Sequence, residues 1–363
     1  MSDRIDEKPT TAGRTSARGM RPPVMADVAR LAGVSHQTVS RVVNGQDNLR
    51  PATRERVEEA IRQLGYRPNT AARALVTRRS ATIGVIGSKT GFWGPSSVHR
   101  TIQAAGREAG FFVSSVNVPD LTRTAVSDAV DHLRDQGVEG IVLIAANDEA
   151  LEVARAQEAA GIPVVVVEGS LYKARWTVGV DQAAGAELAT RHLLDLGHTE
   201  IVHVAGPLQW TEARSRLQGW QNAMHAAGLR PSAHLEGDWT AASGYRAGAE
   251  IAERYDVTAV FAANDQMALG LLRALWEAGR RVPQDVSVVG FDDIPEAEFL
   301  VPPLTTVSQD FTEVGHRAIE ILQAAITDPD PGTDLPERLI QPELVVRAST
   351  AAPGPQKRKV KHS

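Results

Sequence analysis

The sequence contains no cysteine and no long apolar run, and both absences narrow what the protein can be. Without cysteine there is neither a disulfide framework nor a thiolate metal site. No run of about 18 apolar residues is present to span a membrane, and the N-terminal segment 1–22 lacks the apolar core of a signal peptide. We therefore expect a cytoplasmic protein with no membrane partner.

Motifs of the common enzyme classes are also missing, since the chain has no nucleophile elbow, no HExxH and no Walker sequence. Asp292 and Asp293 are adjacent after a strand-like run, where neighbouring side chains point apart and do not share a proton. His192, His198 and His203 are spaced so that no two share a helical face, and they lack carboxylate or cysteine partners. We therefore predict no enzymatic activity, no metal site and no cofactor.

Charge is distributed unevenly along the 363 residues. The whole chain has a formal net charge of −5, with 42% hydrophobic and 23% charged residues, which is typical of a globular protein of two or three domains. Residues 21–80, however, hold eleven arginines against five acidic residues, a net charge of +6. A basic N-terminal module on an acidic body indicates a DNA-binding domain attached to a larger domain of another kind.

Residues 24–45 have the pattern of two short helices joined by a tight turn. Val28 and Leu31 are three residues apart and are predicted to share the apolar face of the first helix, with Asp27 in its first turn. Gly33 can take the positive φ that ends this helix, and Ser35 can cap the next one.

The second helix is amphipathic, and two interpretations of it remain open at this point. Its apolar stripe consists of Val39, Val42 and Val43, which leaves His36, Gln37, Ser40 and Arg41 pointing outward. The pair of helices is either an ordinary αα-hairpin with a polar outer face or a helix-turn-helix whose second helix enters a DNA major groove.

A third helix and a short fourth one are predicted next. Pro51 suits the first position of the third helix and Gly65 its end, with an apolar stripe between them. Pro68 prevents that helix from continuing, and Asn69 can cap a new helix too short to be stable alone. This segment is either a linker with Leu75 tucked against a domain or a short helix that forms only with a partner.

From residue 81 onward, strand-like and helical patterns alternate, which predicts doubly wound parallel sheets in two subdomains with a ligand cleft at the carboxyl ends of the strands. The strand-like runs are expected at 82–87, 111–116, 140–145, 163–168, 201–206, 259–264 and 286–291. Helical patterns are expected at 98–109, 123–136, 183–196, 214–227, 265–278 and 312–326.

Several long segments resemble the LacI/GalR family of bacterial transcription regulators. They are SHQTVSRVVNG in the second helix and EGDWTAASGY, FAANDQMALG, VPQDVSVVGFDDI and PPLTTVSQDF in the body, so that the resemblance covers about residues 23–348. It implies an all-α N-terminal helix-turn-helix domain plus an α/β periplasmic-binding-protein-like core of two doubly wound subdomains. The expected division is a disordered leader (1–22), a helix-turn-helix domain (23–67), a hinge helix and linker (68–80), an effector-binding and dimerisation core (81–349), and a basic disordered tail (350–363).

The resemblance also implies a partner, double-stranded operator DNA of pseudo-palindromic sequence. Base edges are expected to contact His36, Gln37 and Arg41, and the leucine of the hinge helix is expected to enter the minor groove. The tail lacks a heptad of leucines, so we expect a homodimer and no tetramer. The residues implied to bind DNA are Ser35, His36, Gln37, Thr38, Ser40, Arg41, Asn44, Asn69, Ala72 and Leu75.

The expected effector is a small sugar that releases the operator, of galactoside or β-glucoside type. Arg216, Asn264, Asp292 and Gln309 match positions that contact ligand in sugar-responsive members of the family, and Trp239 matches a ring-stacking tryptophan. Trp93 and Trp210 either extend this aromatic platform to a second sugar or pack between lobes or subunits. The residues implied to bind the effector are Ser88, Phe92, Glu168, Trp210, Arg216, Trp239, Asn264, Asp292 and Gln309.

Three other interpretations are weighed against this one. A corepressor-type regulator of the same family would bind a purine or a phosphorylated effector, although a stacking tryptophan at position 239 favours a sugar. A solute-binding protein for transport would need a signal peptide and would have no use for the helix-turn-helix. A sugar-processing enzyme would turn over its bound sugar, but no catalytic motif supports it.

Overall fold

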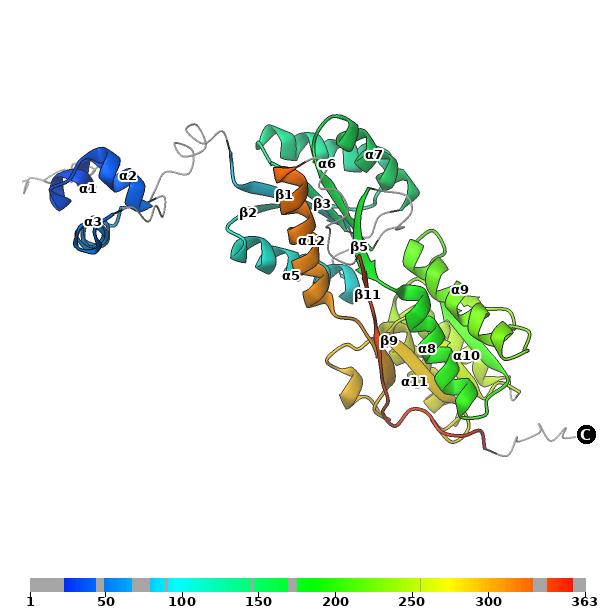
Figure 1. The fold of residues 1–363 in the computed structure, drawn as a ribbon. Coiled ribbons are helices and arrows are strands. Elements are labelled where there is room, and N and C mark those ends of the chain that lie inside the picture. Colours follow the sequence, from blue (N-terminus) through cyan, green and yellow to red (C-terminus); the bar gives the residue numbers. More distant parts are fainter. Residues whose placement is uncertain are drawn as a thin grey trace, which may run out of the picture. The chain divides into compact units, whose positions relative to one another are not determined.

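The computed structural model describes two compact units, one within residues 1–79 and one within residues 80–363 (Figure 1). Several of the expected features lie outside the described residues, namely the leader 1–22, Asn44, the hinge residues Asn69, Ala72 and Leu75, and most of the C-terminal tail. The described residues are 23–43, 49–66, 79–88, 91–144, 147–168, 175–254, 256–328 and 338–354.

The N-terminal unit contains α1 (Met25–Ala32), α2 (His36–Val43) and α3 (Pro51–Leu64). Gly33 ends α1 with a φ of 63°, and the Ser35 hydroxyl accepts a hydrogen bond from the Thr38 amide at 3.1 Å, which caps α2. Pro51 stands at the first position of α3, and Gly65 ends that helix with a φ of 61°. The predicted helix boundaries therefore follow from these four local signals.

The core of this unit differs in one residue from the sequence pattern. Val28, Val39 and Val57 are fully buried, as expected for residues on the inner faces of three packed helices. Leu31, predicted to share the buried face of Val28, is instead 51% exposed. The inner face of α1 runs through the smaller Ala32, because Leu31 lies to one side of the stripe that meets α3.

The larger unit begins with a six-stranded parallel sheet, the N-terminal lobe. Its strand order is β11 (Leu339–Ile340), β5 (Trp176–Val180), β4 (Val164–Val167), β3 (Ile141–Ile144), β1 (Thr82–Ser88) and β2 (Phe112–Val118). On one face of the sheet lie α5 (Trp93–Glu108) and α12 (Phe311–Thr327), and on the other lie α6 (Arg123–Asp135) and α7 (Asp148–Ala159) (Figure 1).

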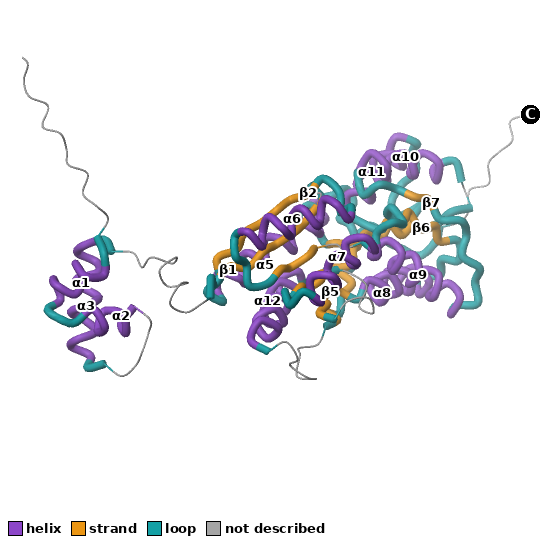
Figure 2. Tube along the Cα trace, turned by 90° about the horizontal axis from the view of Figure 1, so that it is seen from above, coloured by secondary structure: helices purple, strands orange, loops and turns teal. Residues whose placement is uncertain are grey.

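A second six-stranded sheet forms the C-terminal lobe. Its order is β12 (Glu343–Val345), β10 (Thr305–Ser308), β9 (Ser287–Asp292), β8 (Ala259–Ala262), β6 (Ile201–Ala205) and β7 (Leu235–Glu236), with only β12 antiparallel to its neighbour. One face is covered by α8 (Gln182–Asp195) and α9 (Thr211–Ala226). The other is covered by α10 (Ala241–Ala252) and α11 (Asp265–Glu277), which lie side by side (Figure 2), and a 3₁₀ turn spans Ala297–Phe299.

The chain passes between the two lobes after β5, after β10 and after β11. These crossover segments lie where the carboxyl ends of both sheets face each other, the place where doubly wound folds hold ligands. The two doubly wound subdomains predicted from the sequence are thereby confirmed.

All seven strand-like runs form strands, but β2 departs from the expected burial on both faces. Among the described residues it lies at the edge of its sheet and pairs with β1 alone, and Phe112 is 71% exposed. The structure also contains short strands that were not among the predicted runs, such as β5, β7 and β10. Within the described ranges, no helix is long and apolar enough to cross a membrane.

Candidate effector-binding site

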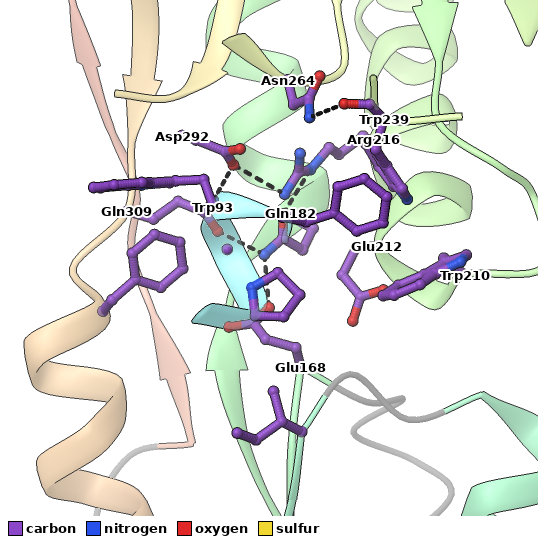
Figure 3. A pocket seen from close by; sticks show the side chains of 15 residues that line it. Trp93, Glu168, Gln182, Trp210, Glu212, Arg216, Trp239, Asn264, Asp292 and Gln309 are labelled. Carbon is purple, nitrogen blue, oxygen red and sulfur yellow. Dashed lines mark hydrogen bonds and ion pairs between the residues drawn. The ribbon is translucent and has the colours of Figure 1, made fainter. Parts of the chain in front are cut away.

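A cavity lies between the lobes at the carboxyl ends of the strands, with a volume of about 530 Å³ including its open mouth (Figure 3). Both lobes contribute side chains, and most of these are aromatic, acidic or amide-bearing. The lining residues are Phe92, Trp93, Gly94, Pro95, Ile144, Glu168, Gln182, Trp210, Glu212, Arg216, Trp239, Asn264, Asp292, Gln309 and Phe311.

Strand ends and helix starts position the polar residues of the C-terminal lobe. Asp292 is the last residue of β9, and Gln309 directly follows β10. Asn264 caps α11, with its side-chain oxygen accepting from the Met267 amide at 2.9 Å. The Asn264 side-chain amide donates to the Trp239 carbonyl at 3.1 Å, which ties the start of α11 to the tryptophan before α10.

Arg216 lies at the centre of the polar residues and is 5% exposed. Its Nε donates to Gln182 Oε1 at 2.8 Å, and one terminal nitrogen lies 3.7 Å from the carboxylate of Asp292. The guanidinium stacks over the Phe291 ring at 3.8 Å and also donates to the Ala263 carbonyl. A buried guanidinium held on several sides presents its remaining donors in a fixed direction.

Gln182, the first residue of α8, connects the two lobes. Its side-chain amide donates to Glu168 Oε2 at 2.7 Å and to Gln309 Oε1 at 2.9 Å. Gln309 in turn donates to Asp292 at 2.7 Å. Glu168, Gln182, Gln309, Asp292 and Arg216 therefore form one continuous network, which we call the polar network (Figure 3).

Burial changes the acidity of the carboxyl groups in this cavity. It raises the pKa of Asp292 to about 6, of Glu168 to about 7 and of Glu212 to about 8. Burial also lowers the pKa of Arg216, against the opposing attraction of Asp292 and the two glutamates. Carboxyl groups with a raised pKa can donate as well as accept hydrogen bonds, so this cavity suits a ligand rich in hydroxyl groups.

Aromatic rings form a second part of the lining. Trp210 makes edge-to-face contacts with Trp239 at 6.4 Å between ring centroids and with Phe92 at 6.5 Å. The two tryptophan planes are 82° apart, so they present two walls that are nearly perpendicular to each other. Trp93 and Trp210 line the cavity and also pack against the cores of both lobes.

Three lining residues have an uncommon backbone conformation. Glu168, Trp239 and Asp292 have φ values of 63°, 71° and 111°, in the region that normally favours glycine. Non-glycine residues in this region are strained, and such strain is concentrated at functional sites. The position of the Trp239 ring requires glycine at position 206, because a Cβ atom there would overlap the indole ring.

The structure brings together nearly all of the expected effector-binding residues. Phe92, Glu168, Trp210, Arg216, Trp239, Asn264, Asp292 and Gln309 line the cavity, whereas Ser88 lies buried at the end of β1 and is not among the lining residues. Gln182, Glu212 and Phe311 also line the cavity, although the sequence did not predict them. Asp293 points away from Asp292 and pairs with Arg347 at 2.8 Å, as expected for adjacent residues at a strand end.

The histidines of the second lobe have structural partners. His203 is buried in the core, where burial lowers its pKa to about 3 and its Nδ1 faces the Phe261 carbonyl at 3.0 Å. His198 contacts Thr258 and Ser287. In the part of the chain that is described, no group of three His, Cys, Asp or Glu side chains could hold a metal ion.

In the N-terminal unit, α2 presents a polar outer face. Ser35, His36, Gln37 and Arg41 are exposed, and Thr38 and Ser40 are half-buried at its margin. The Ser35 and Thr38 hydroxyls hydrogen-bond with each other at 2.9 Å. These two residues therefore cap α2 and also lie on its outer face.

Exposed apolar side chains lie on α11 and around the 3₁₀ turn of the C-terminal lobe, where Trp276 and Val301 line one pocket. Trp276 is 70%, Phe299 75% and Val301 92% exposed, and Leu269 on α11 is also exposed. Large apolar side chains gathered on one exposed surface mark a protein–protein contact. We call Leu269, Trp276, Phe299 and Val301 the apolar surface.

Comparison with known families matches both units. Residues 24–69 match the family described as bacterial regulatory proteins, lacI family, and residues 190–350 match a periplasmic binding protein-like domain. The first match covers α1 to α3, and the second covers most of the lobe that carries Arg216, Trp239 and Asp292.

Curated relatives extend over nearly the whole chain. The lactose operon repressor of Escherichia coli K12 is 36% identical over 342 residues, 93% of each chain. The regulator CelR of Thermobifida fusca is 38% identical over 343 residues, 91% of this chain and 98% of its own. The HTH-type transcriptional repressor PurR of Haemophilus influenzae is 33% identical over 330 residues, 89% of this chain and 97% of its own.

Solved structures agree with the sequence matches. The lac repressor dimer bound to operator and the anti-inducer ONPF has a TM-score of 0.81 at 35% identity, covering 92% of this chain and all of that one. The CelR–cellobiose complex has a TM-score of 0.67 at 34% identity, covering 90% of this chain and 99% of that one. The chain therefore belongs to the lacI family of bacterial regulatory proteins and is a transcriptional repressor of that family, not an enzyme.

Proposed function

We propose that the protein is a homodimeric repressor that leaves its operator when a small neutral sugar, a galactoside or a β-glucoside, binds between the lobes. The observation that carries this proposal is the cavity in which Arg216, Asn264 and Asp292 stand beside Trp239. Vicinal sugar hydroxyls need paired donors and acceptors, and the apolar face of a sugar ring needs an aromatic wall. In this view residues 81–349 hold the effector, and residues 23–67 contact DNA.

The charge of the cavity favours a sugar over a phosphorylated effector. Arg216 carries the one positive charge among the lining residues, and its guanidinium already contacts Gln182, Ala263 and Asp292. A phosphate group would therefore find few free donors and no second cation in this cavity. The relatives support a sugar in part, since one solved relative is a complex with cellobiose. The alternative to be tested is a corepressor-type regulator of the same family, in which an uncharged purine stacks on Trp239.

On the DNA side, α2 is the element we assign to the major groove. His36, Gln37 and Arg41 are exposed on one helix and carry the donors and acceptors that distinguish base pairs. We assign the segment 68–80 the role of a hinge helix, with Asn69, Ala72 and Leu75 at the minor groove. An apolar wedge there would kink the operator at its centre.

The apolar surface is the contact we assign to the dimer. Exposure of Trp276, Phe299 and Val301 on a single chain is costly unless another chain covers them. A two-fold dimer would place two copies of α2 on half-sites related by the same axis, which requires a pseudo-palindromic operator. The chromosome is the site of action of such a regulator, so we place the protein in the cytoplasm, at the nucleoid.

Release of DNA follows from reciprocal coupling between the two sites. If DNA favours one arrangement of the lobes and the sugar favours another, each ligand must weaken the binding of the other by the same factor. The polar network spans two crossover segments, so a sugar that takes over its hydrogen bonds changes the contacts between the lobes. We therefore expect an inducer.

The proposal is tested with an operator selected from random double-stranded DNA by the full-length protein. Fluorescence anisotropy then measures operator affinity with and without galactosides, β-glucosides, free purines and phosphorylated sugars. We expect a palindromic consensus and a loss of affinity with one neutral sugar only. Asp292→Asn, which weakens the sugar site but leaves α2 intact, should bind operator and respond poorly. Tighter operator binding in the presence of a purine would overturn the assignment.

A further inference from the structure

Glu212 is the acidic residue of the cavity that takes no part in the polar network. It is 8% exposed, and apart from its own backbone amide neither side-chain oxygen has a hydrogen-bond partner among the described residues. Glu168 and Asp292, by contrast, both accept hydrogen bonds from glutamine side chains. A buried carboxyl group without partners destabilises the fold, so its presence in a ligand cavity indicates a partner that arrives with the ligand.

The position of Glu212 separates it from the residues around Trp239. It is the second residue of α9, two positions after Trp210, and its side chain lies beside the Trp210 ring on the far side of the cavity from Asp292 and Gln309 (Figure 3). Because the Trp210 and Trp239 planes are nearly perpendicular, one flat ring cannot stack on both. A ligand that stacks on both walls therefore has two rings.

The chemistry of Glu212 favours an uncharged second ring. Burial raises the pKa of its carboxyl to about 8, with the nearby Glu168 acting in the same direction, so the group is mostly protonated at neutral pH. A protonated carboxyl donates one hydrogen bond and accepts others, which is the pattern that a sugar hydroxyl complements. An amine-bearing ligand would instead require the ionised form.

We propose that Trp210 and Glu212 form a second sugar-binding subsite, so that the natural effector is a neutral disaccharide or a β-glycoside with a second sugar ring. This inference rests on the proposed function, that the cavity binds a sugar. The first ring stacks on Trp239 within reach of Arg216, Asn264 and Asp292. The second ring packs against Trp210, and one of its hydroxyl groups hydrogen-bonds with the Glu212 carboxyl.

The test is isothermal titration of the full-length chain with matched pairs of ligands, glucose with cellobiose and galactose with lactose. Glu212→Leu keeps the volume but removes both oxygens, and Glu212→Gln keeps a donor and an acceptor. We expect Glu212→Leu to lower the affinity for the disaccharide about tenfold. Its affinity for the monosaccharide should stay within about twofold of the wild-type value. Glu212→Gln should stay within about threefold for both.

The controls distinguish the subsite from the fold and from the first ring. Gln218→Leu, on the exposed side of the same helix, should change neither affinity. Unchanged monosaccharide binding also reports that each Glu212 variant is folded. Equal losses for both ligand sizes would overturn the subsite, since Glu212 would then contact the first ring.

Three further outcomes would also overturn the proposal. Disaccharide binding that Glu212→Leu leaves unchanged would refute the subsite and leave the sugar-responsive function intact. Preferential binding of an amino sugar, lost in Glu212→Gln as fully as in Glu212→Leu, would show an ion pair in place of a neutral hydrogen bond. If no sugar of either size binds the wild-type chain, the proposed function fails together with the subsite.

Discussion

The side chains of Gln182 and Gln309 hydrogen-bond to each other at 2.9 Å although 127 residues separate them. Gln182 follows the crossover after β5, and Gln309 lies in the crossover between β10 and α12. Two of the segments that join the lobes are thus linked at the floor of the effector cavity. A ligand that hydrogen-bonds with either glutamine acts on both segments at once.

Replacing Gln182 by leucine should lower the free energy of unfolding by about 1–3 kcal/mol, because Glu168, Gln309 and Arg216 would each lose a buried partner. Urea unfolding followed by tryptophan fluorescence measures the change. Gln218→Leu is the matched control, since Gln218 is exposed on α9 and should cost little. A Gln182 variant as stable as the control would mean that the polar network contributes nothing to the fold.

Gly206→Ala should weaken effector binding while leaving operator binding intact. The added methyl group would overlap the Trp239 ring and push it out of the position in which it lines the cavity. Gly87→Ala on β1 is the control, because there the nearest atom would be 3.7 Å away, an ordinary contact. Sugar affinity measured by titration calorimetry should fall about tenfold or more in Gly206→Ala alone. Equal sugar affinities in the two variants would show that Trp239 does not contact the bound sugar.

Stability should depend on pH through Glu212. Burial raises its pKa from the ordinary value of 4.5 to about 8 in the folded state, so folding favours the protonated form. The contribution to stability is complete at low pH and is lost as pH rises from about 5 through 8. Glu212→Gln should therefore remove part of the decline in unfolding free energy over this range, with exposed Glu250→Gln as control. Parallel pH curves for wild type and Glu212→Gln would contradict the burial of an unpaired carboxyl.

Arg41→Ala should weaken binding to the selected operator by about 1–3 kcal/mol and binding to random DNA very little, as expected for a bidentate contact with guanine. Arg62→Ala is a useful comparison, because Arg62 lies on α3 and pairs with Glu59 at its surface. Gel-shift titrations on both DNAs measure the two affinities. Equal losses on operator and random DNA would identify Arg41 as a phosphate contact only.

Phe299→Glu should convert the dimer to a monomer and weaken operator binding by orders of magnitude, because a buried charge in an apolar contact is not compensated. Sedimentation velocity at micromolar concentration measures the assembly. Leu188→Glu places the same charge at a partly exposed site on α8 and should remain dimeric. A dimeric Phe299→Glu protein would move the dimer contact away from the apolar surface.

Local signals and family resemblance predicted different parts of this protein. Gly33, Ser35, Pro51 and Gly65 fix their helix ends through neighbouring residues only, and these predictions are confirmed. The predicted burial of Leu31 was wrong, because two apolar residues three positions apart do not show which side of a helix faces its neighbour.

Some residues of the effector-binding site could be predicted from the sequence, and others could not. Arg216, Trp239, Asn264, Asp292 and Gln309 were expected from matching positions, and all line the cavity. Gln182 looks like an ordinary first-turn residue of a helix, because its partners are distant along the chain. Glu212 resembles a common acidic residue at a helix N-terminus, and only its burial without a partner reveals it.

The positive φ values of Glu168, Trp239 and Asp292 bear on how tightly a ligand can bind. A side chain whose direction is set by an unusual backbone conformation, and then held by neighbours, has few alternative rotamers in the empty cavity. A sugar that enters therefore does not have to order these three groups, and less conformational entropy is lost on association. The entropy of ordering these side chains is lost when the protein folds and not when the effector binds.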